Sequence, residues 1–226
     1  MSWKPGDRRG VVFVSGIDTD CGKTYVTAHL AAYYHSQGVR VITQKPVQTG
    51  CVGMAEDLEV HRRVMGTGLM AEDREGLTCS YLFPVPASPH LSARLTGSRI
   101  ETSRMEGDTR RLAERYDMVL VEGAGGLMVP LNDDEMTIGY IARNKFPLIL
   151  VATSKLGAIN HTLLSVEVCQ KFGVDLQLIV YNRLPGDDKV MADDAYSVVC
   201  REARKLYSGL RIVDYTGDGS FAEAGL

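Results

Sequence analysis

Residues 11–24 read VVFVSGIDTDCGKT and constrain the fold more than any other stretch of the chain. A short apolar run ends at Gly16, a polar turn follows, and Gly22, Lys23 and Thr24 open a segment with helical character. This order of strand, loop and helix is typical of a phosphate-binding loop, in which backbone N–H groups and the positive end of the helix dipole face an anion. In such a loop Lys23 would contact phosphate oxygens, and the Thr24 hydroxyl would reach a magnesium ion.

The loop departs from the common phosphate-binding pattern in its length. Five residues separate Gly16 from Gly22, where the common pattern has four. The longer loop places Thr19 and Asp20 where their side chains can face the phosphates. The simpler alternative is an ordinary strand–turn–helix corner with a surface lysine. The phosphate-binding interpretation is favoured because the strand and the helix are both present in the sequence.

Runs of Val, Ile and Leu recur along the chain and are continuous rather than alternating, as expected of strands buried on both faces of a sheet. These runs cover residues 11–14, 39–42, 118–121, 148–152, 176–181 and 210–213. Segments with helical periodicity lie between them, at residues 25–37, 101–115, 160–172 and 190–207. The alternation predicts an α/β fold: a single P-loop NTPase domain over residues 1–226, with a mostly parallel sheet and helices on both faces. Residues 67–100 contain several prolines and are predicted to form loops and a short helix over the site.

Composition argues against several classes of protein. The net charge is −3 and no basic block stands out, so no nucleic-acid partner is expected. The apolar runs are too short to cross a bilayer, and residues 1–10 lack the apolar core of a signal peptide. The five cysteines are scattered and include no CxxC pair, which argues against a disulfide framework or a zinc site and fits the reducing cytoplasm.

Candidate functional residues follow two further predicted strands, and strand ends of a parallel sheet meet at one edge. Lys45, followed by Pro46, ends the second strand, where a second ammonium can neutralise a transferring phosphoryl group. Glu122 ends a buried strand and is the candidate for holding magnesium directly or through water, and Asp57 can supply a second oxygen. An exposed lysine at a strand end and a solvated glutamate in a turn are the simpler explanations. The neighbouring phosphate loop favours the functional ones.

The last two strand ends also carry polar residues. Asn160 or a neighbour is expected to cap the helix that follows the fourth strand, and the free N–H groups there suit a carboxylate or another anion. His161 is as consistent with packing as with reaction and receives no catalytic role. Asn182 ends the fifth strand with an amide suited to a nucleobase, although a turn residue is an equally common explanation.

Together these motifs resemble the dethiobiotin synthetase family, whose members act in biotin biosynthesis. The resemblance extends over roughly residues 10–185. The matching motifs are GIDTDCGKT (16–24), KPVQTG (45–50), the Asp57 region, PASPH (86–90), VEGAGGLMVPL (121–131), KLGAINHT (155–162) and YN (181–182).

The resemblance implies an enzyme that uses ATP and Mg²⁺ to join CO2, or bicarbonate, to 7,8-diaminononanoate. One amine takes up CO2 as a carbamate, the carbamate attacks the γ-phosphate to give a carbamic–phosphoric anhydride, and the second amine closes the ring as phosphate leaves. The carbamate and the γ-phosphate are both anions, so the reaction needs positive charge near both. The resemblance also implies a homodimer, with the carboxylate tail of the substrate reaching the partner subunit.

The resemblance also implies a role for each matching residue. The residues implied in catalysis are Lys23, Lys45 and Thr19. Those implied in nucleotide binding are Asp20, Cys21, Gly22, Lys23, Thr24, Tyr25, Glu122, Gly123 and Asn182. Those implied in diamine binding are Thr19, Lys45, Thr49, Gly157, Ala158, Ile159 and Asn160, and those implied in holding magnesium are Thr24, Asp57 and Glu122. Residues 212–218 lack the proline that family members usually carry near the base, which leads to the hypothesis of a looser nucleotide preference.

Other functions of a phosphate-binding loop stay open. A switch or partition ATPase carries an additional lysine early in the loop, and residues 17–21 contain none. An ATP-dependent amide ligase of the cobyrinate type usually adds a glutaminase domain with a nucleophilic cysteine, for which 226 residues leave little room. A plain nucleotide-binding protein gives no role to Lys45 or to residues 155–162.

Overall fold

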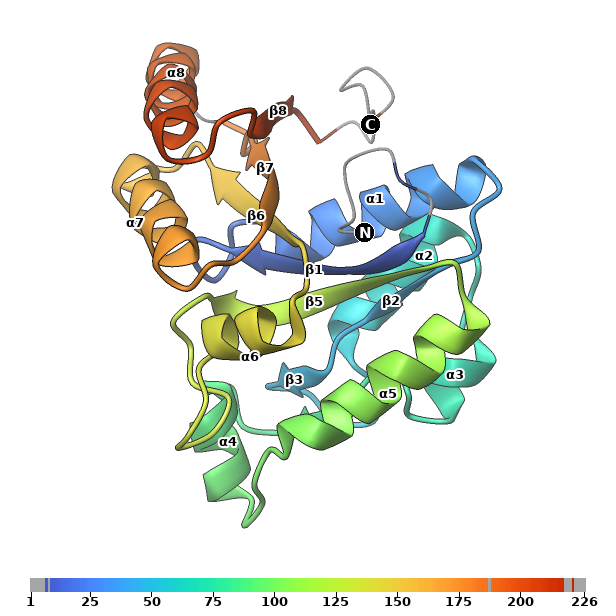
Figure 1. Cartoon of the computed structure of the whole chain (residues 1–226). Coiled ribbons are helices and arrows are strands. Elements are labelled where there is room, and N and C mark those ends of the chain that lie inside the picture. Colours follow the sequence, from blue (N-terminus) through green and yellow to red (C-terminus); the bar gives the residue numbers. More distant parts are fainter. Residues whose placement is uncertain (1–6, 8, 187, 218–220, 222–226) are drawn as a thin grey trace.

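A six-stranded parallel sheet forms the centre of the computed structural model, which describes residues 7, 9–186, 188–217 and 221 (Figure 1). The strand order is β2-β5-β1-β6-β7-β8, and every neighbouring pair is parallel. The strands are β1 (Gly10–Gly16), β2 (Val41–Gln44), β5 (Met118–Gly126), β6 (Leu148–Thr153), β7 (Leu176–Asn182) and β8 (Arg211–Tyr215). Each predicted apolar run overlaps one of these strands, so the predicted parallel sheet is confirmed. The expectations for residues 1–10 and for Asp218 fall largely outside the described residues.

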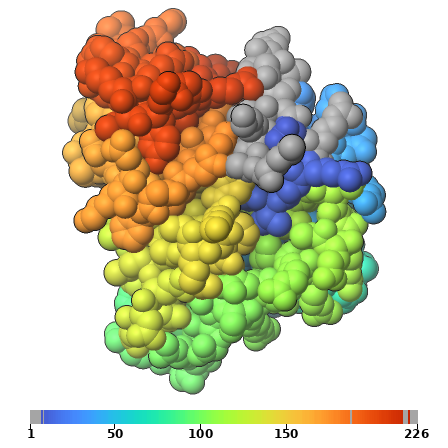
Figure 2. Space-filling view, viewed as in Figure 1, coloured from blue at the N-terminus to red at the C-terminus, as the bar shows by residue number. Residues whose placement is uncertain are grey.

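Helices cover both faces of this sheet, as predicted. One face carries α1 (Lys23–Ser36) and α2 (Glu56–Met65), and the other carries α5 (Thr102–Arg115), α6 (Thr137–Asn144), α7 (Ala158–Lys171) and α8 (Lys189–Leu206). Successive side chains of β1 enter different cores, because Val12 and Val14 pack toward α1 whereas Phe13 packs toward α5 and α6. In the space-filling view most of the visible surface is made of segments coloured green to red, which include α5, α6, α7 and α8 (Figure 2). A strand buried on both faces in this way reads as a continuous apolar run.

Two helices and a small sheet were missed by the sequence patterns. The predicted helices match α1, α5, α7 and α8, whereas α2 and α6 are short and were not predicted. Within residues 67–100 lie α3 (Ala71–Arg74), β4 (Tyr81–Phe83) and α4 (Pro89–Leu95), and β4 pairs with β3 (Val47–Thr49). The loops and the short helix predicted there are confirmed. Strands of three residues are too short to show a periodicity.

Successive strands are added first on one side of β1 and then on the other, and this reversal of strand order determines where the site lies. From β1 the chain runs through α1 to the edge strand β2, returns to β5 beside β1, and then crosses to β6 on the other side of β1. In such sheets the crevice at the carboxyl ends of the strands, at the point of reversal, is where ligands bind. None of the described helices combines the length and the apolar character needed to span a membrane.

Candidate active site

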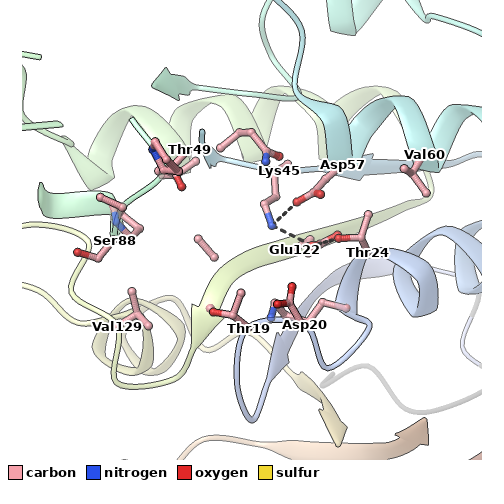
Figure 3. A pocket seen from close by; sticks show the side chains of 18 of the residues that line it. Thr19, Asp20, Thr24, Lys45, Thr49, Asp57, Val60, Ser88, Glu122 and Val129 are labelled. Carbon is pink, nitrogen blue, oxygen red and sulfur yellow. Dashed lines mark hydrogen bonds and ion pairs between the residues drawn. The ribbon is translucent and has the colours of Figure 1, made fainter. Parts of the chain in front are cut away.

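A cavity of about 880 Å³ opens at the carboxyl ends of β1, β2 and β5 (Figure 3). Ten of the predicted site residues line it, namely Thr19, Asp20, Gly22, Lys23, Thr24, Tyr25, Lys45, Thr49, Asp57 and Glu122. The remaining lining residues include Gln48 on β3, Val60 on α2 and residues 86–89 at the start of α4. The segment that was predicted to lie over the site therefore does contribute to its wall.

The first wall of the cavity is the loop between β1 and α1, which is held together mainly by its own backbone. Lys23 is buried, and its Nζ donates to the carbonyl oxygen of Asp18 at 2.7 Å. Gly22 has a φ of 91°, and Asn182 Nδ2 donates to the carbonyl oxygen of Cys21 at 3.0 Å. A Cβ at position 22 would lie 2.2 Å from that Nδ2, so this loop conformation requires glycine.

Two residues assigned to nucleotide binding lie behind the loop instead of lining the cavity. The Cys21 side chain is buried, and a Cβ placed on Gly16 would lie 2.4 Å from its Sγ. The thiol therefore fills the space beneath the loop. The amide nitrogen of Asn182 supports the loop backbone, so its predicted contact with the base stays a prediction.

The opposite wall is built from side chains of β2, α2 and β5. Lys45 Nζ lies 2.7 Å from Asp57 Oδ2 and 2.8 Å from Glu122 Oε1, and it also donates to the carbonyl oxygen of Gly123 at 3.0 Å (Figure 3). The Thr24 hydroxyl donates to the same Glu122 Oε1 at 2.9 Å. Glu122 therefore joins the phosphate-binding loop to the second lysine, as the position of these residues at neighbouring strand ends predicted.

The ion pair between Lys45 and Glu122 is buried, and the two charges stabilise each other. Burial alone would raise the pKa of Glu122, but the charge of Lys45 and the hydrogen bond from His61 hold that pKa well below its usual range. Burial would likewise lower the pKa of Lys45, but the carboxylates of Glu122 and Asp57 outweigh it and raise the pKa. At neutral pH the wall therefore presents the Lys45 ammonium directly beside the Glu122 carboxylate.

Sequence reasoning missed two buried polar residues on α2. His61 Nε2 lies 2.8 Å from Glu122 Oε2 and His61 Nδ1 lies 2.9 Å from Thr43 Oγ1, while Arg62 donates to the same Thr43 oxygen at 2.7 Å. His61 and Arg62 are 0% and 2% exposed. The signal was present in the spacing of Asp57 and His61, which are four residues apart and so share one face of a helix. This spacing was not interpreted as a helical face because α2 itself was not predicted.

The start of α7 lies away from this cavity. Gly157, Ala158, Ile159 and Asn160 are not among its lining residues, and Gly157 occupies the N-cap position with a φ of 92°. Among the described residues no side chain caps the helix, so the side-chain cap expected from Asn160 or a neighbour is not found: the N-cap position is a glycine and Asn160 lies inside the first turn. A second cavity of about 350 Å³ beside α7 is lined by His161 and other residues, and Val129 lines both cavities.

The donor set suits magnesium carried by a nucleotide. Thr24, Asp57 and Glu122 offer hydroxyl and carboxylate oxygens, which are the ligands that Mg²⁺ prefers. Within the described part of the chain no cluster of three or more His, Cys, Asp or Glu side chains forms a metal site. In proteins Mg²⁺ usually binds through one or two carboxylates and keeps phosphate and water ligands.

Comparison with known proteins assigns the family. A family model described as "AAA domain" matches residues 10–212. The ATP-dependent dethiobiotin synthetase BioD 2 of Pasteurella multocida is 47% identical over 195 residues, which cover 86% of this chain and 92% of the relative. The chain belongs to the ATP-dependent dethiobiotin synthetase family. The BioD enzyme of Chlorobaculum tepidum is 43% identical over 216 residues, covering 95% of this chain and 90% of the relative. The family resemblance inferred from the motifs is therefore confirmed, and with it the assignment as an ATP-dependent ligase.

Solved structures of other proteins share the fold at low identity. A ParA family ATPase from Chlorobium tepidum has a TM-score of 0.52 at 15% identity and covers 96% of this chain and 88% of its own. The cell division protein FtsY from Thermotoga maritima has a TM-score of 0.56 at 17% identity, covering 97% of this chain and 66% of its own. These likenesses show that the chain has the P-loop NTPase fold that the sequence predicts. They concern the fold alone and not the activity.

Proposed function

We propose that the protein uses ATP and Mg²⁺ to convert 7,8-diaminononanoate and CO2 to dethiobiotin, with ADP and phosphate as the other products. The observation that carries this proposal is the meeting of two lysines from opposite walls, Lys23 and Lys45, in one cavity beside two carboxylates. A reaction between two anions, a carbamate and a triphosphate, needs both of these positive charges. Membership of the dethiobiotin synthetase family supports the choice of substrates.

The first step forms a carbon–nitrogen bond between one amine of the substrate and CO2. The amine loses a proton and becomes a carbamate, which carries a negative charge. Lys45 and Thr49 line the same side of the cavity, and Thr19 faces them across it (Figure 3). In this proposal the three side chains hold the carbamate and the diamine so that a carbamate oxygen points at the γ-phosphorus.

The second step transfers the γ-phosphoryl group. A carbamate oxygen forms a bond to the γ-phosphorus, the bond from that phosphorus to the ADP oxygen breaks, and a carbamic–phosphoric anhydride results. Lys23 and the backbone N–H groups of the loop hold the phosphates, while Lys45 neutralises the oxygens in transfer. Thr24, Asp57 and Glu122 would hold a magnesium ion together with the nucleotide, and that ion would supply further neutralisation of phosphate charge.

The third step closes the ring. The second amine attacks the carbonyl carbon, the carbon–oxygen bond to the phosphoryl group breaks, and phosphate leaves as the amine loses a proton. Two carboxylate partners hold Lys45 in place on its wall. In this proposal the lysine therefore stays within reach of the leaving phosphate. One lysine thus serves the formation and the collapse of the anhydride.

The homodimer belongs to the same proposal. Met128 and Leu164 expose 53% and 56% of their surface beside the second cavity, and Val129 connects that cavity to the first. A second copy covering this face would bury these side chains and bring the start of α7 toward its partner's diamine. Sedimentation equilibrium tests this, with Leu164→Glu expected to give a monomer that binds the diamine more weakly.

Two smaller proposals follow from residues outside the cavity. All five cysteines are free, which supports the reducing cytoplasm as the location. The hypothesis of a looser base preference rests partly on Asp218, which lies outside the described residues. Comparing ATP, CTP and GTP as phosphate donors tests it, and strict dependence on ATP would contradict it.

Phosphate release from ATP tests the main proposal. It is measured with neither, one or both of the diamine and bicarbonate, and the product is identified by mass spectrometry. We expect release only when both are present, together with one dethiobiotin per phosphate. Release stimulated by DNA or by membranes would favour a switch ATPase instead, and release without dethiobiotin would favour another ligase.

A further inference from the structure

His61 is a buried histidine with a partner at each ring nitrogen. Its side chain projects from α2 one turn after Asp57, on the same face of the helix. It is 0% exposed, and so is Glu122, whose Oε2 lies 2.8 Å from His61 Nε2. The ring is held away from the cavity, so it does not touch substrate or nucleotide.

The partners of His61 determine which ring nitrogen donates a hydrogen bond to Glu122. Arg62 can only donate, and its guanidinium donates to Thr43 Oγ1 at 2.7 Å. Thr43 Oγ1 also lies 2.9 Å from His61 Nδ1. The Glu122 carboxylate can only accept, so His61 carries a proton on Nε2 and donates it to Glu122 Oε2.

The far end of this chain of hydrogen bonds is anchored by a buried ion pair. Arg62 donates to both oxygens of Asp73, at 2.8 and 2.7 Å, and the Asp73 side chain is 1% exposed. Thr78 and the backbone of Met70 also donate to Asp73, each at 2.8 Å. The chain from Asp73 to Glu122 therefore has no exposed member that could swing freely.

The two oxygens of Glu122 have separate tasks in this arrangement. Oε1 accepts from Thr24 and Lys45, which both line the cavity. Oε2 points the other way and is occupied by His61. A carboxylate held at both oxygens cannot rotate without breaking these bonds, so the contact with His61 fixes the direction in which Oε1 faces together with the bonds from Thr24 and Lys45.

We propose that His61 is a positioning residue, whose Nε2–H holds Oε2 of Glu122 so that Oε1 is presented to the magnesium of the bound nucleotide. This inference rests on the proposed role of Glu122 as a magnesium ligand. His61 acts through Glu122 and not on the substrate. Partners that orient a metal ligand in this way typically change metal affinity about 10- to 100-fold when they are removed.

Two polar substitutions of similar size separate the two ring contacts. In His61→Gln the side-chain amide nitrogen reaches the place of Nε2 and can still donate to Glu122. In His61→Asn the shorter amide reaches only the place of Nδ1, so the contact with Thr43 is kept and the contact with Glu122 is lost. A purely structural role would make the two variants equally defective.

The test is the affinity of Mn²⁺, as a probe for Mg²⁺, for the ADP-bound protein, measured by electron paramagnetic resonance. We expect His61→Asn to weaken Mn²⁺ binding by about tenfold or more, and His61→Gln to stay within about threefold of the unchanged protein. Equal affinity in the unchanged protein and His61→Asn would overturn the proposal. So would an equal loss in both variants.

Two further measurements keep the test decisive. Glu122→Gln should weaken Mn²⁺ binding at least as much as His61→Asn. No effect there would refute the metal role of Glu122 itself. If either His61 variant fails to fold, the ¹⁵N signals of His61 in the unchanged protein decide, because Mg²⁺ with ADP should shift the Nε2–H resonance, and an unmoved resonance would overturn the proposal. None of these measurements needs the diamine or CO2, so a failure of ring closure would leave them intact.

Discussion

The two walls of the cavity hold their lysines in different ways. On the phosphate-binding loop, Lys23 donates to a backbone carbonyl within the same loop, five residues before it in the chain. On the opposite wall, Lys45 lies between two carboxylates, Asp57 on the helix α2 and Glu122 on the strand β5. One wall is thus a continuous piece of backbone, and the other is assembled from side chains of three elements.

This difference predicts which substitutions impair each wall. A backbone loop is sensitive to the space and the dihedral angles available to its residues, so its weak points are glycines. A buried network of charges is sensitive to the removal of one partner, because the remaining charge is left in a medium of low polarity. Substitutions on the first wall should therefore act on nucleotide binding, and those on the second on catalysis, metal binding and stability toward acid.

The largest effect is expected for Lys45→Ala. We expect turnover to fall by about 10²- to 10³-fold, because the ammonium is needed most while the phosphoryl group is in transfer. Nucleotide affinity should stay within about threefold, since Lys23 and the loop are unchanged. Turnover is measured as dethiobiotin formed, and affinity by calorimetric titration with ATP. The exposed Lys171→Ala is the control, and unchanged turnover in Lys45→Ala would refute the assigned role.

On the first wall the expected effect of Gly22→Ala is smaller and falls on ATP. An added Cβ meets Asn182 Nδ2 at 2.2 Å, so the loop must shift, and we expect ATP affinity to fall by about tenfold or more. Gly38→Ala is the matched control, because Gly38 has a similar positive φ but nothing within 4 Å of the added atom. It should lose about 1 kcal/mol of stability and no affinity. If the two variants bind ATP equally well, contact with Asn182 is not what limits position 22.

The contrast between the walls also explains what could be predicted from the sequence. The loop wall is contiguous, so GIDTDCGKT placed Thr19, Asp20, Lys23 and Thr24 correctly at the cavity. Lys45 and Glu122 were also found, because the ends of parallel strands must meet at one edge. A position just after a parallel strand predicts which edge of the sheet a residue reaches, and the residues of both walls lie at that edge.

The second wall was predicted only in part, because the residues behind Glu122 lie on α2, a helix that was not predicted. His61 and Arg62 lie on α2, whose ten residues include five charged side chains and only four apolar ones. Asp57 was proposed from the sequence as a second oxygen for magnesium, but its ion pair with Lys45 was not predicted. Asn182 shows the opposite case, because its position at a strand end gave no sign that it packs behind the loop.

Stability toward acid should distinguish the walls at equilibrium. The pKa of Glu122 is lower in the folded protein than its ordinary value of 4.5, so its ion pair stabilises the fold above that value and is lost as the pH falls below it. Asp73, whose pKa is also lowered, adds to the same loss. We expect the free energy of unfolding in urea to fall steeply between about pH 5 and pH 3. Glu122→Gln should make this decline shallower, and an equally steep decline would mean that other carboxylates control acid unfolding.

The smallest effect is expected for Thr49→Val, which tests the part of the second wall that carries no charge. Thr49 lines the cavity on β3, and in the proposed function its hydroxyl contacts the diamine. Losing one hydrogen bond of about 1 kcal/mol should raise the KM for the diamine about fivefold and leave the KM for ATP unchanged. Thr67→Val is the control, because the Thr67 hydroxyl bonds only to the loop backbone at Gly68. A rise in the KM for ATP instead would move Thr49 from the diamine side of the cavity to the nucleotide side, and the division of labour between the two walls would then have to be redrawn.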